Sequence, residues 1–170
     1  SDATMLLVGT HSGMAIGKDG VTQMGLEDVA LMRALPNMKV YQPATYNQTR
    51  DMLKLIVDQS GPSYLRLGRQ PIDEFFELNS DIQLGKLQVV KDCEDPDITV
   101  VTSGCVLTDV MKAVDMIEKS DGKSVSVLNA HTLKPFDAEG LVKHTKNSDL
   151  VVTVEDHTIM GGLGSIVAEV

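Results

Sequence analysis

Residues 26–67 read LEDVALMRALPNMKVYQPATYNQTRDMLKLIVDQSGPSYLRL, and the order of patterns in this stretch decides the fold class. Apolar residues recur at helical spacing over residues 26–35, and residues 39–42 predict a short strand. Thr45 is suited to cap a second helix, and residues 63–67 predict a second strand. Helices that alternate with strands in this way are typical of a parallel sheet with helices covering it.

The same alternation extends on both sides of this stretch. Before it, residues 5–10 form an apolar run that predicts a buried strand. After it, three further strands are expected at residues 98–102, 124–128 and 150–154. The helices are expected to turn the following residues inward: Met52, Leu53, Ile56 and Val57 after Thr45; Val110, Ala113, Val114 and Ile117; Ala138, Leu141 and Val142 after Asp137, which is suited to be an N-cap; and Leu163, Ile166, Val167 and Val170.

An acidic, polar segment separates two blocks of this pattern. It is rich in Asp and Glu, and Pro71 and Pro96 punctuate it, as is common in linkers between domains. We therefore predict an α/β protein with two blocks of mostly parallel sheet covered by helices. The expected boundaries are residues 1–70 for the first block, 71–97 for the linker and 98–170 for the second block.

The charge and the cysteine content exclude several classes of partner and site. The formal net charge is −9, from 15 basic and 24 acidic residues, whereas nucleic acids and anionic membranes attract clustered Lys and Arg. Two cysteines, Cys93 and Cys105, are too few for a disulfide scaffold or a Cys-rich zinc site. No apolar run resembles a membrane span or a signal peptide. We expect a cytoplasmic protein that binds neither nucleic acid nor membranes.

A polar loop over residues 10–28 holds the candidate binding residues. Because a strand ends where this loop begins, His11 should project from the carboxyl end of that strand, where parallel α/β sheets bind ligands. Glycines at positions 13, 17 and 20 let the backbone run close to a ligand, and Asp19 lies between a lysine and a glycine. The pattern is compatible with a substrate loop, but by itself it favours a plain surface loop with a turn at residues 18–20.

Five sequence motifs follow one another along the chain. They are Thr10-His11 with Asp19-Gly20 and Leu26-Glu27-Asp28; Gln42-Pro43-Ala44-Thr45; GPSYLRLGRQ at residues 61–70; TLKPFD at residues 132–137; and Val154-Glu155-Asp156-His157 with Gly161-Gly162-Leu163-Gly164. In this order they resemble the transketolases, and they cover nearly the whole chain apart from the linker. The resemblance implies that the first block is the end of a thiamine diphosphate-binding pyrimidine domain. The second block would be a transketolase C-terminal domain, which we expect to be incomplete.

The resemblance also implies roles for individual residues. His11 corresponds to a histidine near the substrate phosphate, Arg69 to a phosphate-binding arginine, and Asp19 to an aspartate that hydrogen-bonds a substrate hydroxyl. Arginine suits phosphate because its fixed fork of donors matches the phosphate oxygens. Gln23 occupies a cofactor-binding position that is His in many transketolases, and an amide cannot shuttle a proton near neutral pH. Arg66, in contrast, is expected to be a salt-bridged structural arginine.

The implied activity is the transfer of a two-carbon ketol unit from a ketose phosphate to an aldose phosphate, as in the pentose phosphate pathway. The implied cofactors are thiamine diphosphate and magnesium. Residues 17–20 do not match the Gly-Asp-Gly motif of a magnesium-diphosphate site, and the cofactor-activating glutamate belongs to an earlier part of the pyrimidine domain. We therefore assign no metal ligand and no catalytic residue here.

The last apolar helix has no stop signal, and we expect a piece of a longer polypeptide or one subunit of a split enzyme. It would be inactive alone and completed by the remaining transketolase domains or subunit in a homodimer or larger assembly.

Two other interpretations stay open. The first is another thiamine diphosphate enzyme, either a deoxyxylulose phosphate synthase or the beta subunit of a 2-oxoacid dehydrogenase. The spacing of His11 and Asp19, and Arg69 after Leu-Gly, favour a transketolase. The second is a non-catalytic dimerisation module. The retained binding residues argue against it, but it stays open because the residues that bind the cofactor diphosphate are missing from this sequence.

Two motifs near the end of the chain have competing explanations. Glu155, Asp156 and His157 resemble metal ligands, but adjacent residues at a strand end seldom converge on one ion. We expect them to form hydrogen bonds at a domain or subunit contact. The glycine-rich residues 161–164 precede a helix and could bind phosphate, but the lysine of a phosphate loop is missing. We expect them to let a helix pack closely against a strand.

Overall fold

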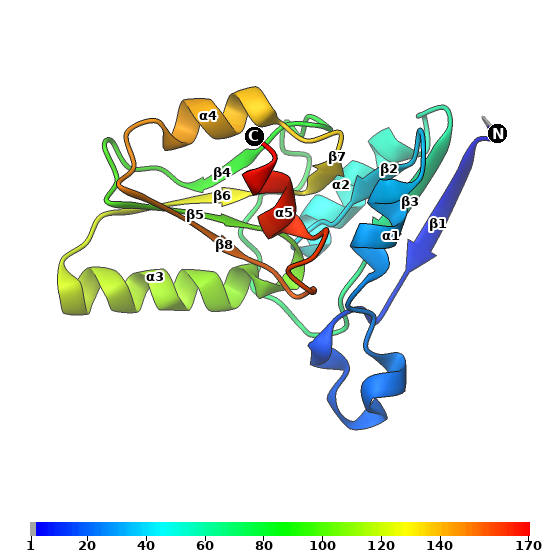
Figure 1. Ribbon diagram of the computed structural model, residues 1–170, viewed down its shortest axis with the longest axis horizontal. Helices are drawn as coiled ribbons and strands as arrows, with labels where there is room; N and C mark the ends of the chain where they lie inside the picture. The colour runs from blue at the N-terminus through cyan, green and yellow to red at the C-terminus, as the bar shows by residue number, and fades with distance from the viewer. Residues whose placement is uncertain (1–2) are drawn as a thin grey trace.

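The computed structural model describes residues 3–170, which form two four-stranded sheets surrounded by helices (Figure 1). The first sheet has the order β1-β3-β2-β7 and the second has the order β4-β6-β5-β8. The strands are β1 (Met5–Gly9), β2 (Lys39–Tyr41), β3 (Pro62–Arg66), β4 (Gln88–Lys91), β5 (Ile98–Thr102), β6 (Val125–Asn129), β7 (Thr132–Lys134) and β8 (Leu150–Val154). The helices are α1 (Asp28–Ala34), α2 (Tyr46–Ile56), α3 (Leu107–Asp121), α4 (Ala138–Thr145) and α5 (Leu163–Ala168).

The strand directions confirm the predicted α/β class with mostly parallel sheets. Strands β1, β3 and β2 run parallel to one another, as do β6, β5 and β8. The antiparallel pairs are β2 with β7 and β4 with β6. Both predicted N-caps are confirmed, since the side chain of Thr45 accepts a hydrogen bond from the amide of Gln48 and that of Asp137 accepts one from the amide of Gly140. In residues 3–170 no helix has the length and apolarity that crossing a membrane requires.

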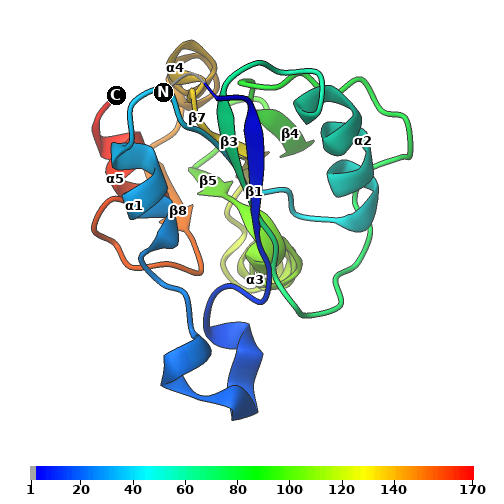
Figure 2. The same cartoon turned by 90° about the vertical axis from the view of Figure 1, so that its right-hand side faces the viewer.

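Helices cover both faces of each sheet. Figure 2 shows α1 and α2 on opposite sides of the first sheet. In the second sheet, alternate residues of a strand face opposite sides, so Val100 packs in a cluster with α3 while Val101 packs in a cluster with α4 and α5. The apolar runs in these strands therefore follow from their burial on both faces.

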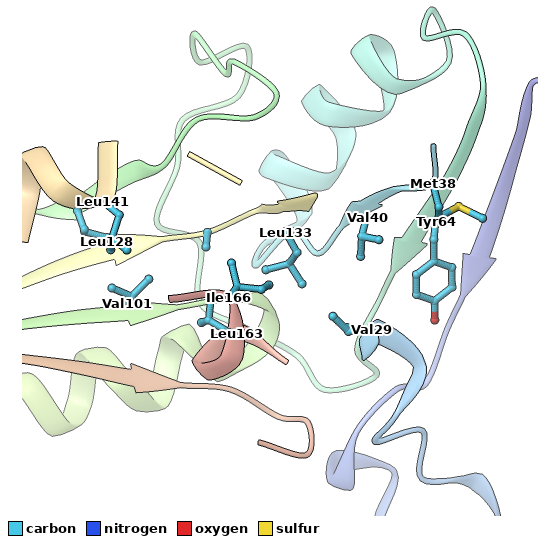
Figure 3. Packing of buried hydrophobic residues seen from close by; sticks show 11 residues of the cluster. Val29, Met38, Val40, Tyr64, Val101, Leu128, Leu133, Leu141, Leu163 and Ile166 are labelled. Carbon is cyan, nitrogen blue, oxygen red and sulfur yellow. The ribbon is translucent and has the colours of Figure 1, made fainter. Parts of the chain in front are cut away.

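The two blocks share one hydrophobic core. Val29, Val40 and Tyr64 of the first block lie in the same cluster as residues of the second block (Figure 3). The second-block members of that cluster are Val101, Leu128, Ala130, Leu133, Leu141, Leu163 and Ile166. Strand β7 also belongs to the second half of the chain but completes the first sheet by pairing with β2. Part of the apolar surface of each block is thus buried by the other.

A buried polar contact lies at the junction of the blocks. Gln48 of α2 is fully buried, and its Nε2 donates hydrogen bonds to Oδ1 of Asn129 at 2.8 Å and Oε1 of Gln88 at 2.7 Å. Gln88 belongs to β4, which lies inside residues 71–97, the segment expected to be a linker. Phe76 and Ile82 of that segment are buried as well. Much of the segment therefore packs against the blocks that it connects.

Several sequence expectations about burial are wrong. The residues that were expected to face inward but are exposed include Ala113, Ala138 and Val170. Strand β1 is the edge strand of its sheet, and Met5, Leu7 and Val8 are exposed rather than buried. Val57 is 63% exposed because α2 ends at Ile56, so Val57 lies beyond the helical face that meets the core. Val142 in α4 is 57% exposed, since the helix buries the neighbouring Leu141 instead.

The close contact between Gly161 and α1 gives a testable prediction. A Cβ on Gly161 would lie 2.6 Å from Cβ of Ala30, and its φ is +75°. Gly122 has a similar φ of +64°, but a Cβ there would meet no atom of the described residues within 4 Å. We expect Gly122→Ala to cost about 1 kcal/mol from backbone strain alone, and Gly161→Ala roughly 1–3 kcal/mol more from overpacking. Urea unfolding of both variants measures the difference, and equal losses would contradict close packing at Gly161.

His131 gives a second prediction, on the pH dependence of stability. The side chain is buried after β6, and this burial lowers the pKa of His131 from 6.5 to about 4. Between these values the unfolded chain binds a proton that the folded chain does not, so stability falls as the pH drops and is fully retained above 6.5. The whole effect is on the order of 3 kcal/mol.

Replacing His131 with Gln should therefore flatten the pH dependence of unfolding in this window. The measurement is the free energy of unfolding of the wild type and of His131→Gln in urea, at about pH 7 and about pH 5. The other titrating groups are common to both proteins, so they cancel in the comparison. An equal loss of stability in the two proteins would show that His131 does not titrate as its burial implies.

Candidate functional site

The candidate site lies where β1 and β3 end side by side. The two strands are parallel, with Gly9 opposite Arg66, so their carboxyl ends meet at one rim of the first sheet. The chains stay together beyond the strands, because the amide of Leu67 donates to the carbonyl of Gly9 and the amide of Ser12 donates to the carbonyl of Leu67. This rim carries the loop that follows β1 and the segment that follows β3, as the strand-end rule for α/β sheets predicts.

The loop after β1 projects away from the sheet as two short 3-10 turns. The turns span Met14–Asp19 and Val21–Gln23, and the loop is drawn in blue below the strands in Figure 1. Most of its side chains are exposed, with Ile16 an exception at 6% exposure. The loop is thus held mainly at its ends and at a few points along its length.

Asp19 and Arg69 meet in this loop, although 50 positions separate them. Nη1 of Arg69 lies 2.9 Å from Oδ2 of Asp19 and 3.4 Å from the carbonyl oxygen of Ile16. The side chains are 49% and 51% exposed, and ion pairs as open as this one typically contribute at most about 1 kcal/mol. The pair can therefore open at little cost when a ligand competes for either group.

His11 lies on the same rim but does not join this pair. Its backbone is in the left-handed region with φ of 61°, and its ring Nδ1 is 3.0 Å from Oγ1 of Thr10. The ring is exposed, and within residues 3–170 no hydrogen bond or ion pair connects it to Asp19 or Arg69. An unusual backbone conformation of this kind for a non-glycine residue is common at binding sites.

Gln23 ends the second 3-10 turn, and its side chain is exposed. Its backbone amide donates to the carbonyl of Gly20, which shapes the turn. The amide side chain is open to the surroundings of the loop and can donate and accept hydrogen bonds there. Gln23 belongs to the same loop as Asp19, and its side chain forms no hydrogen bond with Arg69 among the described residues.

Arg66 is a buried structural arginine, as expected from the sequence. It is 1% exposed, and its Nε donates to Oδ2 of Asp28 at 2.8 Å, an oxygen that also accepts from the hydroxyl of Tyr64 at 2.6 Å. Burial by itself raises the pKa of Asp28, but the hydrogen bond and charge of Arg66 outweigh it and hold that pKa below its usual value. Burial and the bond to Asp28 raise the pKa of Tyr64. The cluster is therefore an ion pair with a neutral phenol beside it.

The residues after β8 form only part of the hydrogen bonds that were expected between the two blocks. Asp156 reaches the other block, since its Oδ1 accepts a hydrogen bond from the amide of Met14 at 3.0 Å. Glu155 stays within its own block, where its carboxylate accepts from the amides of Leu163 and Gly164 at the start of α5. The expected hydrogen bond at a domain contact thus forms for Asp156, whereas the carboxylate of Glu155 bonds within its own block. No group of three metal-ligating side chains gathers anywhere in residues 3–170.

A cavity of about 420 Å³ opens beside the rim, at the carboxyl ends of β2 and β3. It is lined by residues that include Pro43, Thr45, Gly68, Gln70 and Cys105. Gly68 and Gln70 flank Arg69 in the sequence, but Arg69 does not line this cavity and pairs with Asp19 instead. The predicted binding groups therefore lie on the loop side of the rim.

Sequence reasoning missed the contacts that hold the loop. It noted Asp156 as part of a motif and Gly13 as a flexible position, but it could not pair them, because 143 positions separate them. The signal available in the sequence was a carboxylate after a strand end and a glycine after His11. Only the packing of the two blocks brings these together.

Comparison with known proteins identifies both blocks. The family model of the transketolase pyrimidine binding domain matches residues 1–73, and that of the transketolase C-terminal domain matches residues 85–170. A putative transketolase C-terminal section of Methanocaldococcus jannaschii is 37% identical over 96% of this chain and 51% of its own length. A 6-deoxy-6-sulfo-D-fructose transketolase subunit of Clostridium sp. is 35% identical over 96% of this chain and 50% of its own length.

A solved structure described as a split gene transketolase, inactive beta4 tetramer, has the same fold. It superposes with a TM-score of 0.85 at 38% identity, over 96% of this chain and 52% of the solved chain. The chain spans about half the length of the two curated relatives named above. Two family models in tandem, at the positions of the two blocks, cover most of its length. The chain belongs to the transketolase family of thiamine diphosphate-dependent enzymes.

Proposed function

We propose that this chain is part of a transketolase that transfers a two-carbon ketol unit from a ketose phosphate to an aldose phosphate. The observation that carries the proposal is the ion pair of Asp19 and Arg69 on the rim that also bears His11. Two groups implied as substrate binders by the family resemblance come into contact, although nothing in the sequence places them together. The open setting of the pair suits a site that exchanges one partner for a ligand.

The charges explain how a sugar phosphate would enter this site. A phosphate dianion carries more charge than a carboxylate and matches the fork of the guanidinium, so it would compete with Asp19 for Arg69. Asp19 would then be free to accept a hydrogen bond from a substrate hydroxyl, and His11 would donate to the phosphate from the neighbouring strand end. The net charge of −9 makes such a local cationic group necessary for binding an anion.

The same groups indicate the substrate class, because Arg69 would bind the anionic end of the substrate. The choice of sugar would depend on hydrogen bonds to its hydroxyl groups. Relatives of this chain are named for 6-deoxy-6-sulfo-D-fructose and for apulose-4-phosphate, both of which carry an anionic end. Arg69 would recognise that anion in either case. We propose sugar phosphates as the substrates, as in the pentose phosphate pathway.

The thiamine diphosphate of the complete enzyme supplies a carbon nucleophile that takes up the ketol unit. Among this chain's residues, Gln23 fits the role of a hydrogen-bonding neighbour, because its amide is exposed on the loop that carries Asp19. An amide binds and orients a group without exchanging protons, so proton transfer would fall to other residues. We propose that the ligands of the diphosphate and of magnesium lie outside this chain.

The remaining domains would come from the same polypeptide or from a second subunit. A relative with the same fold is described as a split gene transketolase in an inactive tetramer of its beta chain. We propose that this chain likewise needs its complementary part and works in a dimer or larger assembly. Its two cysteines are free thiols, which supports the cytoplasm as its location.

The role of Arg69 can be tested in the complete enzyme. We expect Arg69→Ala to raise the KM for the sugar phosphate roughly 10- to 100-fold, because charge-assisted hydrogen bonds to the phosphate are lost. Arg50→Ala is the matched control, since Arg50 is an exposed arginine on α2, outside both the loop after β1 and the segment after β3. Steady-state kinetics with both variants decide the point, and an unchanged KM for Arg69→Ala would refute phosphate binding by this residue.

The need for a complementary part gives another prediction. The chain alone should neither turn over sugar phosphates nor bind thiamine diphosphate tightly, whereas addition of the remaining domains or subunit should restore ketol transfer. Calorimetric titration with the cofactor and magnesium measures the first point, and an assay with and without pyruvate separates ketol transfer from synthase chemistry. Micromolar affinity for the cofactor in the isolated chain would contradict the proposed division of the site.

A further inference from the structure

The second block holds the candidate substrate loop from outside the site. Oδ1 of Asp156 accepts the hydrogen bond from the amide of Met14, the first residue of the 3-10 turn that ends at Asp19. The far end of the loop is held by the same segment, where the amide of Thr158 donates to the carbonyl of Leu26 at 2.9 Å. A single segment after β8 therefore contacts both ends of a loop more than 130 positions away.

The contact at Asp156 is tight as well as polar. A Cβ on Gly13 would lie 1.8 Å from Oδ2 of Asp156, so the carboxylate packs directly on the bare Cα of this glycine. Gly13 has φ of +82°, a conformation that side chains disfavour, and its amide donates to the carbonyl of Gly25. The bend between His11 and Met14 is shaped to receive a carboxylate from the other block.

Arg66 holds the backbone of Asp156 in place. Its Nη2 donates to the backbone carbonyls of both Gly25 and Asp156 at 2.9 Å, which ties the two segments to one buried guanidinium. Between Met14 and Gln23 the loop is mostly exposed, with the bond of Arg69 to Ile16 as a further anchor. The hydrogen bond from Met14 to Asp156 thus lies at the point where the held part of the loop passes into the projecting part.

We infer that Asp156 is a positioning residue for substrate binding: it holds the bend between His11 and the turn that presents Asp19. The inference rests on the proposed function, because it assigns the second block a part in a substrate site that this block does not line. Without the acceptor, the loop must be ordered by the substrate itself, and that ordering reduces affinity. The chemical step is unaffected, since Asp156 touches no reacting group.

Two variants remove the hydrogen bond between Met14 and Asp156, one by deleting its acceptor and one by deleting its donor, and a third variant retains it. Asp156→Ala deletes the acceptor, and Met14→Pro deletes the donor at the first position of a helical turn, where proline is tolerated. Asp156→Asn keeps an acceptor oxygen and the shape of the side chain. Glu169→Ala is the control, because Glu169 pairs with Arg33 across the same two blocks without touching the loop.

We expect Asp156→Ala and Met14→Pro, assembled in the complete enzyme, to raise the KM for the sugar phosphate about tenfold. Their kcat should stay within about a factor of two, the pattern of lost ground-state binding. Asp156→Asn and Glu169→Ala should keep a KM close to that of the wild type. A KM that stays unchanged in the first two variants, or rises equally in the control, would overturn the inference.

Amide hydrogen exchange on the full polypeptide tests the contact without reference to activity. Exchange over residues 14–23 should become faster in Asp156→Ala and keep the wild-type rate in Asp156→Asn and Glu169→Ala. Unchanged exchange in Asp156→Ala would overturn the inference. Faster exchange in a protein whose wild type transfers no ketol unit would support the contact and reject the proposed function, so the two failures are distinguishable.

Discussion

The buried guanidinium of Arg66 is the interaction on which the arrangement of this protein depends. A charge at 1% exposure is tolerated only when it is paired and its donors are satisfied. Arg66 meets that condition with the carboxylate of Asp28 and the carbonyls of Gly25 and Asp156. One side chain of β3 therefore connects α1, the end of the candidate substrate loop and the second block. Removing any of these partners would leave a buried charge incompletely satisfied.

The candidate site combines this rigid support with an open surface. Behind the rim, the ion pair of Arg66 and Asp28 is shielded from water, and Asp156 is held beside it. At the rim, Asp19 and Arg69 are about half exposed, so their attraction is weak and readily exchanged for a ligand. A binding site needs both properties. Its side chains must be held in position before the substrate arrives, and the pair that faces the substrate must separate when the substrate binds. The two arginines, three positions apart, differ in role because one is buried and the other is not.

Sequence patterns predicted most helices and strands of this fold, but they predicted the burial and the pairing of these elements less well. The six predicted strands and the helices between them form, because the repeat of apolar residues reports local geometry directly, whereas β4 and β7 were not predicted. Burial was wrong at β1 and at Val57 and Val142, since the order of strands and the last turn of each helix decide exposure. The pairing of β7 with the first sheet was not foreseen, because three residues carry no signal for a partner so distant in the chain.

The sequence by itself determined the α/β class, the two helix caps, the structural role of Arg66 and the family, since these depend on residue types at short spacing or on motifs in order. Tertiary structure alone decided that Asp19 pairs with Arg69 and that the carboxylate of Asp156 packs against Gly13. Such contacts join residues from distant segments, and they form only when a shared core brings the two blocks together. Local patterns specify which elements form, whereas packing specifies which side chains meet.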